Sequence, residues 1–379
     1  MENPAIKITD VKVTPLAREG RAMSCLVEVE TDAGITGIGE TYGGGFSAAI
    51  RPYGEFAIAI KAIIEKGYKS VLLGENPTNY RSLWDKMYNY SWLAETGVGM
   101  AALSGVDMAL VDLTGKALGV PVCKLLGGCY RNRVRPYASH PWMTPKTHKE
   151  VCKEAAELVE QGYTAMKISF ARFWGFGENL KEDMKYVREI RDAIGYDVDL
   201  AISDSAPPRS VSKAISMARR LEEYDLLFWE DPLIRGDVEG YAKLTSAVDL
   251  PIEAGEEMTP QMLKYFIRRR VVDVVNPDVC QHGGLSECKK IADLAHAAGI
   301  RDIPHGFLSA IGATANIHLV ASMPDGDLME FRTSLPDPSM NDLLVEPLKF
   351  ENGYIEVPQE PGLGIELNRK VLEEIRWAG

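Results

Sequence analysis

The chain has 379 residues, of which 46% are hydrophobic and 25% are charged, and its formal net charge is −12. This length exceeds what one small core organises, so we expect two domains or a large barrel with an accessory unit. The acidic balance argues against nucleic acid or an anionic membrane as a partner. No uninterrupted apolar run reaches the roughly 18 residues of a membrane span, and the N-terminus lacks the apolar core of a signal peptide.

The cysteines indicate the redox environment. There are six, and none forms a CxxC pair: Cys25, Cys123, Cys129, Cys152, Cys280 and Cys288. In a chain of this size, scattered cysteines are typical of reduced and mostly buried thiols. We therefore predict a cytoplasmic protein without disulfides.

The first part of the chain mixes strands with helices. Residues 6–13 and 26–30 alternate as strands do, and the turn residues 31–34 precede a further strand in ITGIGE. From about residue 47 to residue 119 the apolar residues follow helical spacing. Strands followed by segregated helices predict an α+β domain, which we place at residues 1–130.

A regular alternation of predicted strands and helices begins near residue 133. Short apolar runs alternate with amphipathic segments, and the runs are VRPYAS, TAMKISF, DVDLAISD, LLFWED, PIEAGE, VDVVNPD, RDIPHG and DLMEF. Eight such units predict an α/β fold with a TIM-type (β/α)8 barrel at residues 131–341, whose final unit is irregular. Residues 342–379 are rich in Gly and Pro and read as a segment that returns to the first domain.

The ends of these runs carry the chemistry, because function gathers at the C-terminal ends of barrel strands. Asp204, Glu230 and Glu256 stand at equal spacing at three successive strand ends. Neighbouring parallel strands would bring the three carboxylates together, and hard oxygen ligands suit Mg²⁺. The alternative is three unrelated helix caps or surface acids. The regular triple favours a site for one Mg²⁺ per subunit.

Two further strand ends pair a base with an acid. His305 follows RDIPHG, and Asp278 ends the preceding run, so a carboxylate can orient the imidazole. Lys167 in TAMKISF can bind a carboxylate or carry a proton, although a lysine at this position can also extend to solvent. A cation, a lysine and a base together suit removal of a proton α to a carboxylate, because the cations offset the charge of the enolate.

With these motifs the chain resembles the enolase superfamily, and within it the mandelate racemase-like subgroup. The resemblance covers VEVETDAGITGIGE, ALSGVDMALVDLTGKALGVPVCKLLGG, the barrel and the closing PGLGIELN. It implies a modified (β/α)7β barrel and an N-terminal α+β cap that the C-terminal segment completes. It also implies metal ligands at Asp204, Glu230 and Glu256, a His305–Asp278 dyad, and a contact from Glu330 to a substrate carboxylate.

Two departures narrow the expected reaction. Family racemases carry a K-x-K motif in the second strand, whereas this chain has Lys167-Ile168-Ser169, so the second base is missing. The usual D-x-N pattern is replaced by Asp204-Ser205-Ala206, so we expect the loop that carries the first ligand to differ from that of the family. One base at His305 favours syn-dehydration of a sugar acid to a 2-keto-3-deoxy acid over two-base racemisation. WEDPLIRGDVEGYAKL and ARFWGFG are similar to rhamnonate-type sugar acid dehydratases.

Substrate contacts are harder to predict. In the family the cap loops cover the substrate, so residues 17–24 and 42–51 are the expected lid. Side chains near strand ends could meet sugar hydroxyls or serve ordinary loop roles, and the candidates are Ser169, His140, Trp174, Arg209 and His282. The sequence does not name the sugar acid or its stereochemistry.

Other functions remain open. PDVCQHGGLSECKKIA also resembles sugar-acid lactone cycloisomerases, and a racemase or epimerase of the same superfamily is a further alternative. A Schiff-base aldolase would use Lys167 as nucleophile. A non-catalytic binding protein would retain the fold without turnover. We expect a homo-oligomer, from dimer to octamer, as is common in the family.

Overall fold

The structure is a computed structural model that describes most of the chain. The described residues are 6–18, 21–42, 54–90, 92–95, 97–139, 147–169, 180–203, 210–306, 309–333 and 342–377. The first domain opens with three antiparallel strands in the order β1-β2-β3: β1 (Ile8–Arg18), β2 (Arg21–Thr31) and β3 (Thr36–Tyr42). Helical elements of different lengths follow them: α1 (Gly54–Ala62), η1 (Ile63–Tyr68), α2 (Lys69–Leu72), η2 (Pro77–Asn79), α3 (Tyr80–Tyr90), η3 (Trp92–Glu95), α4 (Gly97–Leu118) and α5 (Val122–Leu125). This is the expected α+β cap.

Helix α4 is the centre of the cap. Its backbone lies very close to two glycines of β3. A Cβ added to Gly37 would stand 2.1 Å from the carbonyl oxygen of Ala109 in α4, and a Cβ added to Gly39 would stand 2.2 Å from that of Gly105. By length and composition alone this helix is apolar enough to cross a bilayer, although charged residues interrupt it. Inside the protein, 89% of its apolar window is buried, as in the core helix of a globular domain.

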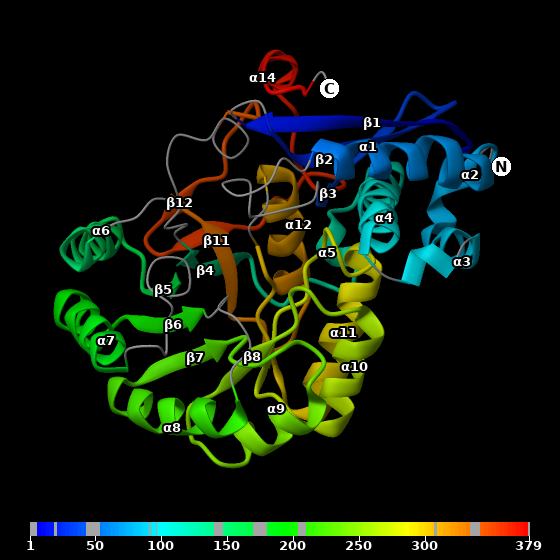
Figure 1. Ribbon diagram of the computed structural model, residues 1–379. Helices are drawn as coiled ribbons and strands as arrows, with labels where there is room; N and C mark the ends of the chain where they lie inside the picture. The colour runs from blue at the N-terminus through cyan, green and yellow to red at the C-terminus, as the bar shows by residue number, and fades with distance from the viewer. Residues whose placement is uncertain are drawn as a thin grey trace.

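Eight parallel strands form the barrel (Figure 1). They are β4 (Arg133–Ser139), β5 (Ala165–Ser169), β6 (Asp199–Ser203), β7 (Leu226–Glu230), β8 (Ile252–Ala254), β9 (Val274–Val275), β10 (Arg301–Asp302) and β11 (Leu328–Arg332). Strands β4 to β10 pair in chain order, and β11 pairs in parallel with β4. Between β10 and β11, the Glu330 N–H donates to Pro304 O at 3.2 Å. The barrel is therefore closed, as predicted.

Helices cover the outside of the barrel. They are α6 (His148–Glu160), α7 (Leu180–Ile194), α8 (Val211–Leu221), η4 (Glu222–Tyr224), α9 (Val238–Thr245), α10 (Pro260–Arg269), α11 (Gly284–Ala298) and α12 (Ala310–Ala321). Side chains cap several N-termini where orphan N–H groups need acceptors, and the capping residues are Thr147, Ser210, Asp237, Thr259 and Ser309. No long helix follows β11 in the described residues, so the barrel is the (β/α)7β form.

The tail returns to the cap. After β12 (Phe350–Glu351), β13 (Tyr354–Glu356) pairs antiparallel with β4, and α14 (Arg369–Glu374) lies beside β1 in Figure 1. Leu16 bridges Arg376, and the Trp377 N–H donates to Pro15 O at 3.0 Å. The boundaries at residues 130 and 341 remain predictions.

Cap and barrel are joined by polar contacts to the start of α11. The Trp84 indole donates to Gly283 O at 2.8 Å, and the Gly283 N–H donates to Ser104 Oγ at 2.8 Å. Asp107 Oδ2 accepts from the Ser286 N–H at 2.9 Å. Because these donors and acceptors are buried, each contact fixes the cap against the barrel strongly.

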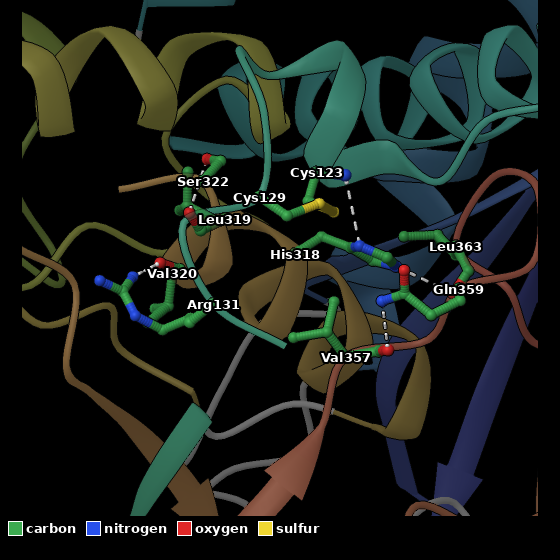
Figure 2. Close-up of a disulfide and its surroundings, with 10 residues drawn as sticks. All are labelled: Cys123, Cys129, Arg131, His318, Leu319, Val320, Ser322, Val357, Gln359 and Leu363. Carbon is green, nitrogen blue, oxygen red and sulfur yellow. Dashed lines mark hydrogen bonds between the residues drawn. A yellow bond between two sulfur atoms is a disulfide. The ribbon is translucent and has the colours of Figure 1, made fainter. Parts of the chain in front are cut away.

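Two cysteines correct the expectation that all six are reduced. Cys123 and Cys129 form a disulfide, whereas Cys25, Cys152, Cys280 and Cys288 are free. Figure 2 shows the bond beside His318, whose Nδ1 accepts from the Cys123 N–H at 3.3 Å. The intervening Gly127 and Gly128 both have φ of 117°, a conformation that glycine adopts readily and that turns the chain back.

Candidate active site

Three of the predicted residues meet inside the mouth of the barrel. Lys167 lies in the middle of β5, Glu230 ends β7, and Glu330 is in the middle of β11. Lys167 Nζ is 2.7 Å from Glu230 Oε1 and 3.1 Å from Glu330 Oε1, and all three side chains are buried. Burial lowers the pKa of Lys167, but the two carboxylates outweigh it and hold that pKa well above its usual value. The two carboxylates therefore favour the ammonium form of the lysine.

His305 and Asp278 form the predicted pair. His305 Nδ1 is 2.6 Å from Asp278 Oδ2, and Asp278 is fully buried. The Cys280 N–H donates to Asp278 Oδ1 at 2.6 Å, and Gln281 Nε2 donates to Oδ2 at 3.2 Å. A carboxylate held in this way fixes the ring so that Nδ1 donates and Nε2 is directed to the site.

The other imidazole nitrogen faces two carboxylates. His305 Nε2 is 3.1 Å from Glu256 Oε2 and 3.7 Å from Glu330 Oε2. Burial lowers the pKa of His305, but Glu256, Glu330 and Asp278 outweigh it and raise that pKa to about 10. Glu256 makes the largest of these charge contributions, so a cation bound by Glu256 would lower this pKa again, toward the range that a base needs.

Glu330 is held as a carboxylate. The Gly306 N–H donates to its Oε2 at 3.0 Å, and Ser139 also hydrogen-bonds to it. Burial raises the pKa of Glu330, but Lys167 and His305 outweigh it and lower that pKa to about 2.

Two of the three predicted metal ligands are described. Glu230 lies at the end of β7, Glu256 follows β8, and these two strands are paired. Asp204 lies outside the described residues, and among those described no three His, Cys, Asp or Glu side chains converge as a metal-binding group. Burial raises the pKa of Glu256 to about 8, His305 opposes this shift, and the nearby Glu230 and Asp231 add to it. A cation bound at this carboxylate would favour its ionised form.

The mouth of the barrel has an excess of carboxylates. Asp231, the residue after Glu230, is buried at the start of the next loop with φ of 47°. Arg235 Nε is 3.3 Å from Asp231 Oδ2, and Arg235 Nη2 is 3.8 Å from Glu256 Oε1. Burial raises the pKa of Asp231 to about 7. Oxygen donors with more negative than positive charge around them fit a hard divalent cation.

Sequence reasoning missed several inward-facing residues. Asn276 Nδ2 donates to Glu230 Oε1 at 2.8 Å, and its Oδ1 has no hydrogen-bond partner in the described structure. Glu253 is fully buried on β8 with neither carboxyl oxygen paired, and burial raises its pKa well above the usual value. Asn276 stands two residues before Asp278, so the two-residue period of a strand was a signal available for it. Glu253 stands three residues before Glu256, so this period gave no signal for it.

The substrate-contact predictions are mostly untested. His140, Trp174 and Arg209 lie outside the described residues, as does the side chain of Ser169. Most of the expected lid also lies outside the described residues, namely residues 19–20 and 43–51.

His282 is placed differently from the prediction. It is fully buried, its Nδ1 accepts from the Asp278 N–H at 3.0 Å, and its Nε2 is 3.0 Å from Gly255 O. With both nitrogens engaged it supports the backbone of Asp278, so we no longer expect it to contact substrate.

A closed barrel with an α+β cap, a lysine, a His–Asp pair and acids at the strand ends defines an enolase-type enzyme. Comparison with known families agrees. Residues 6–127 match "Mandelate racemase / muconate lactonizing enzyme, N-terminal domain", and residues 150–371 match "Enolase C-terminal domain-like". The chain belongs to the mandelate racemase/muconate lactonizing enzyme family of the enolase superfamily.

Similar proteins cover almost the whole chain. A D-galactarolactone cycloisomerase from Agrobacterium fabrum is 32% identical and matches 95% of this chain and 93% of its own. An arabinonate dehydratase from Saccharolobus solfataricus is 32% identical over 92% of this chain and 89% of its own. The crystal structure of the 3,6-anhydro-D-galactonate cycloisomerase from Zobellia galactanivorans has a TM-score of 0.86 at 32% identity, with 98% of this chain and 99% of that chain covered.

Proposed function

We propose that this protein is a Mg²⁺-dependent sugar acid dehydratase with a single base, His305. The proposal rests on the family and on relatives named as arabinonate, D-galactonate and D-xylonate dehydratases, which are 30–32% identical. The observation that carries it is the 2.6 Å contact between His305 and Asp278, because an oriented imidazole can accept a proton at Nε2.

The second lysine base of family racemases is missing from this chain. Lys167 is held in two ion pairs, with Glu230 and Glu330, which favour its charged ammonium form over the neutral amine that a base needs. The same ion pairs argue against a Schiff-base aldolase, whose lysine must be neutral to attack a carbonyl. Position 169, where a family racemase has its second lysine, is a serine. One base favours elimination over racemisation.

The chain's own residues suit each stage of the reaction. Lys167 provides a fixed positive charge for the substrate carboxylate and the enolate that forms from it. His305 takes the α-proton and then delivers it to the β-hydroxyl that leaves from the same face, so water departs and an enol remains. The enol then becomes the 2-keto-3-deoxy acid.

The proposed ligands of Mg²⁺ are Asp204, Glu230 and Glu256. Bound there, the ion would supply a Lewis acid that stabilises the enolate oxygens. Asn276 donates a hydrogen bond to Glu230, and Arg235 lies 3.8 Å from Glu256, so each of these two carboxylates has a neighbouring side chain that can orient it.

A sugar-acid lactone cycloisomerase is the second candidate. Two cycloisomerases at 32% identity favour it, and such a reaction also needs only one base. The two functions differ in substrate, a linear acid for one and a lactone for the other.

The test is a screen of the purified protein with Mg²⁺ against linear mono- and di-acid sugars and their lactones, with 2-keto acid detected as its semicarbazone. The proposal predicts 2-keto acid from a linear acid, and loss of at least about 100-fold in kcat in His305→Asn or with EDTA. Turnover of lactones alone would move the assignment to cycloisomerase. Full activity of His305→Asn would overturn the mechanism.

A further inference from the structure

One buried carboxylate of the cap has no part in the proposed reaction, yet it reaches the catalytic half of the barrel. Glu40 lies on β3 and is only 1% exposed. Its Oε1 accepts from the Ser309 N–H at 3.1 Å. Its Oε2 accepts from Ser309 Oγ at 2.7 Å and from the Gly312 N–H at 2.9 Å. Ser24 of β2 also hydrogen-bonds to it.

These donors belong to the first turn of α12. The first N–H groups of a helix have no partner within the helix, and a carboxylate there is favoured by hydrogen bonding and by the helix dipole. Ser309 is itself the N-cap, since its Oγ accepts from the Ile311 N–H at 3.2 Å. Glu40 therefore caps α12 from a different domain.

Helix α12 in turn holds the backbone of the proposed base. Asn316, in the middle of α12, donates from Nδ2 to His305 O at 2.8 Å. The helix begins at Ala310, five residues after His305. A shift of α12 would therefore move the imidazole relative to Asp278 and Glu330.

The same strand of the cap also contacts the other member of the pair. The Tyr42 N–H, at the end of β3, lies 3.5 Å from Cys280 O, and the Cys280 N–H donates to Asp278. The end of β3 thus touches both loops that carry the His305–Asp278 pair, just before the chain enters residues 43–51.

We propose that Glu40 is a positioning residue that couples the cap to the base through α12, so that His305 is held correctly only while the cap is docked. The proposal rests on the proposed function in one respect, the role of His305 as base. The contacts on which it is built are independent of the substrate.

The test compares Glu40→Gln with Asp112→Asn. The amide has the shape of the carboxylate but lacks its charge. It therefore weakens the hydrogen bonds between residue 40 and the N-terminus of α12 without leaving a cavity. Asp112 is a matched control because it is fully buried in α4 and accepts from the Ile38 and Leu363 N–H groups, yet none of its described hydrogen bonds is to the first turn of α12, where Glu40 binds. Ser309→Ala, which removes one of the contacts to Glu40, is a milder second variant should Glu40→Gln fail to fold.

Two readouts are needed. Hydrogen–deuterium exchange should rise at His305, Gly306 and the first turn of α12 in Glu40→Gln and not in Asp112→Asn. With an identified substrate, kcat of Glu40→Gln should fall about 10- to 100-fold with KM changed less than about threefold, because small misplacement of a catalytic group has effects of this size. Ser309→Ala should show smaller changes of the same kind, and Asp112→Asn should keep kcat even where its melting temperature falls.

Three outcomes would overturn the proposal. One is unchanged exchange at α12 in Glu40→Gln. The second is raised exchange with wild-type kcat. The third is a fall of kcat in Asp112→Asn as large as that in Glu40→Gln. Failure of the proposed function is distinguishable, because it would be seen as full activity of His305→Asn, whatever the exchange at α12 shows.

Discussion

At the scale of single residues, the site is defined by how charges are shared. Lys167 forms ion pairs with both Glu230 and Glu330, and Asp278 orients His305. Each of these side chains is at least 93% buried, so each pair acts in a medium of low dielectric where an unpaired charge would be costly.

Another buried histidine, His318, lies away from the site and is held neutral. It allows the effect of burial on a histidine pKa to be tested through the stability of the protein. Burial lowers its pKa to about 4, while its Nε2 is 3.0 Å from Leu363 O (Figure 2). Because the folded pKa is below the ordinary value of 6.5, the stability it contributes is fully present above about pH 6.5. That stability is lost as the pH falls toward 4.

We expect the free energy of unfolding of the wild type to fall relative to His318→Gln by about 2 kcal/mol between pH 7.5 and 5. Urea titrations at the two pH values measure this difference. A difference that does not change with pH would contradict the assignment, and His296→Gln, which replaces a half-exposed histidine, is the control.

The charged residues of the site could be predicted from the sequence, because an acid, a lysine or a histidine at the end of an apolar run is unusual enough to stand out. Lys167, Asp278, His305 and Glu330 were found in this way. Asn276 was not, since an uncharged amide gives no such signal. Glu40 could not be linked to the base at all, because its partner is Ser309, far along the chain in another domain.

At the scale of elements, the strands could be predicted in number and order, but less well in length. Strands β8, β9 and β10 have only three, two and two residues. Their apolar runs are longer because the chain stays buried beyond the last ladder pair while it carries Glu256, Asp278 and His305 into the site. The glycines of ITGIGE indicated that another backbone comes close to this strand, but not that this backbone is α4.

The disulfide belongs to the link between α5 and β4. Without reductant, we expect four of the six cysteines to react in denaturant, and all six after reduction. The double variant Cys123→Ser, Cys129→Ser should be less stable by about 2 kcal/mol, because the bond closes a short loop. Mass spectrometry after alkylation counts the thiols, and Cys152→Ser should lower either count by one. Six reactive thiols without reductant would contradict the bond.

At the scale of the whole molecule, cap, barrel and tail form one connected unit. The tail pairs with β4 through β13 and with β1 through Arg376, and the cap reaches α11 and α12 through Ser104, Asp107 and Glu40. This arrangement could be predicted only through the family resemblance, because no composition or spacing in a single chain tells where one domain docks on another.

The central claim is that one base, His305, removes the α-proton and that the β-hydroxyl then leaves. The most direct measurement is a reaction in D₂O with the substrate from the screen, followed by NMR of the product for the wild type and for His305→Asn. The account predicts a 2-keto-3-deoxy acid with one deuterium at C3 from the wild type and no product from the variant. A product that keeps its C3 hydroxyl and carries deuterium at C2 would contradict it, and would make the protein a racemase or epimerase.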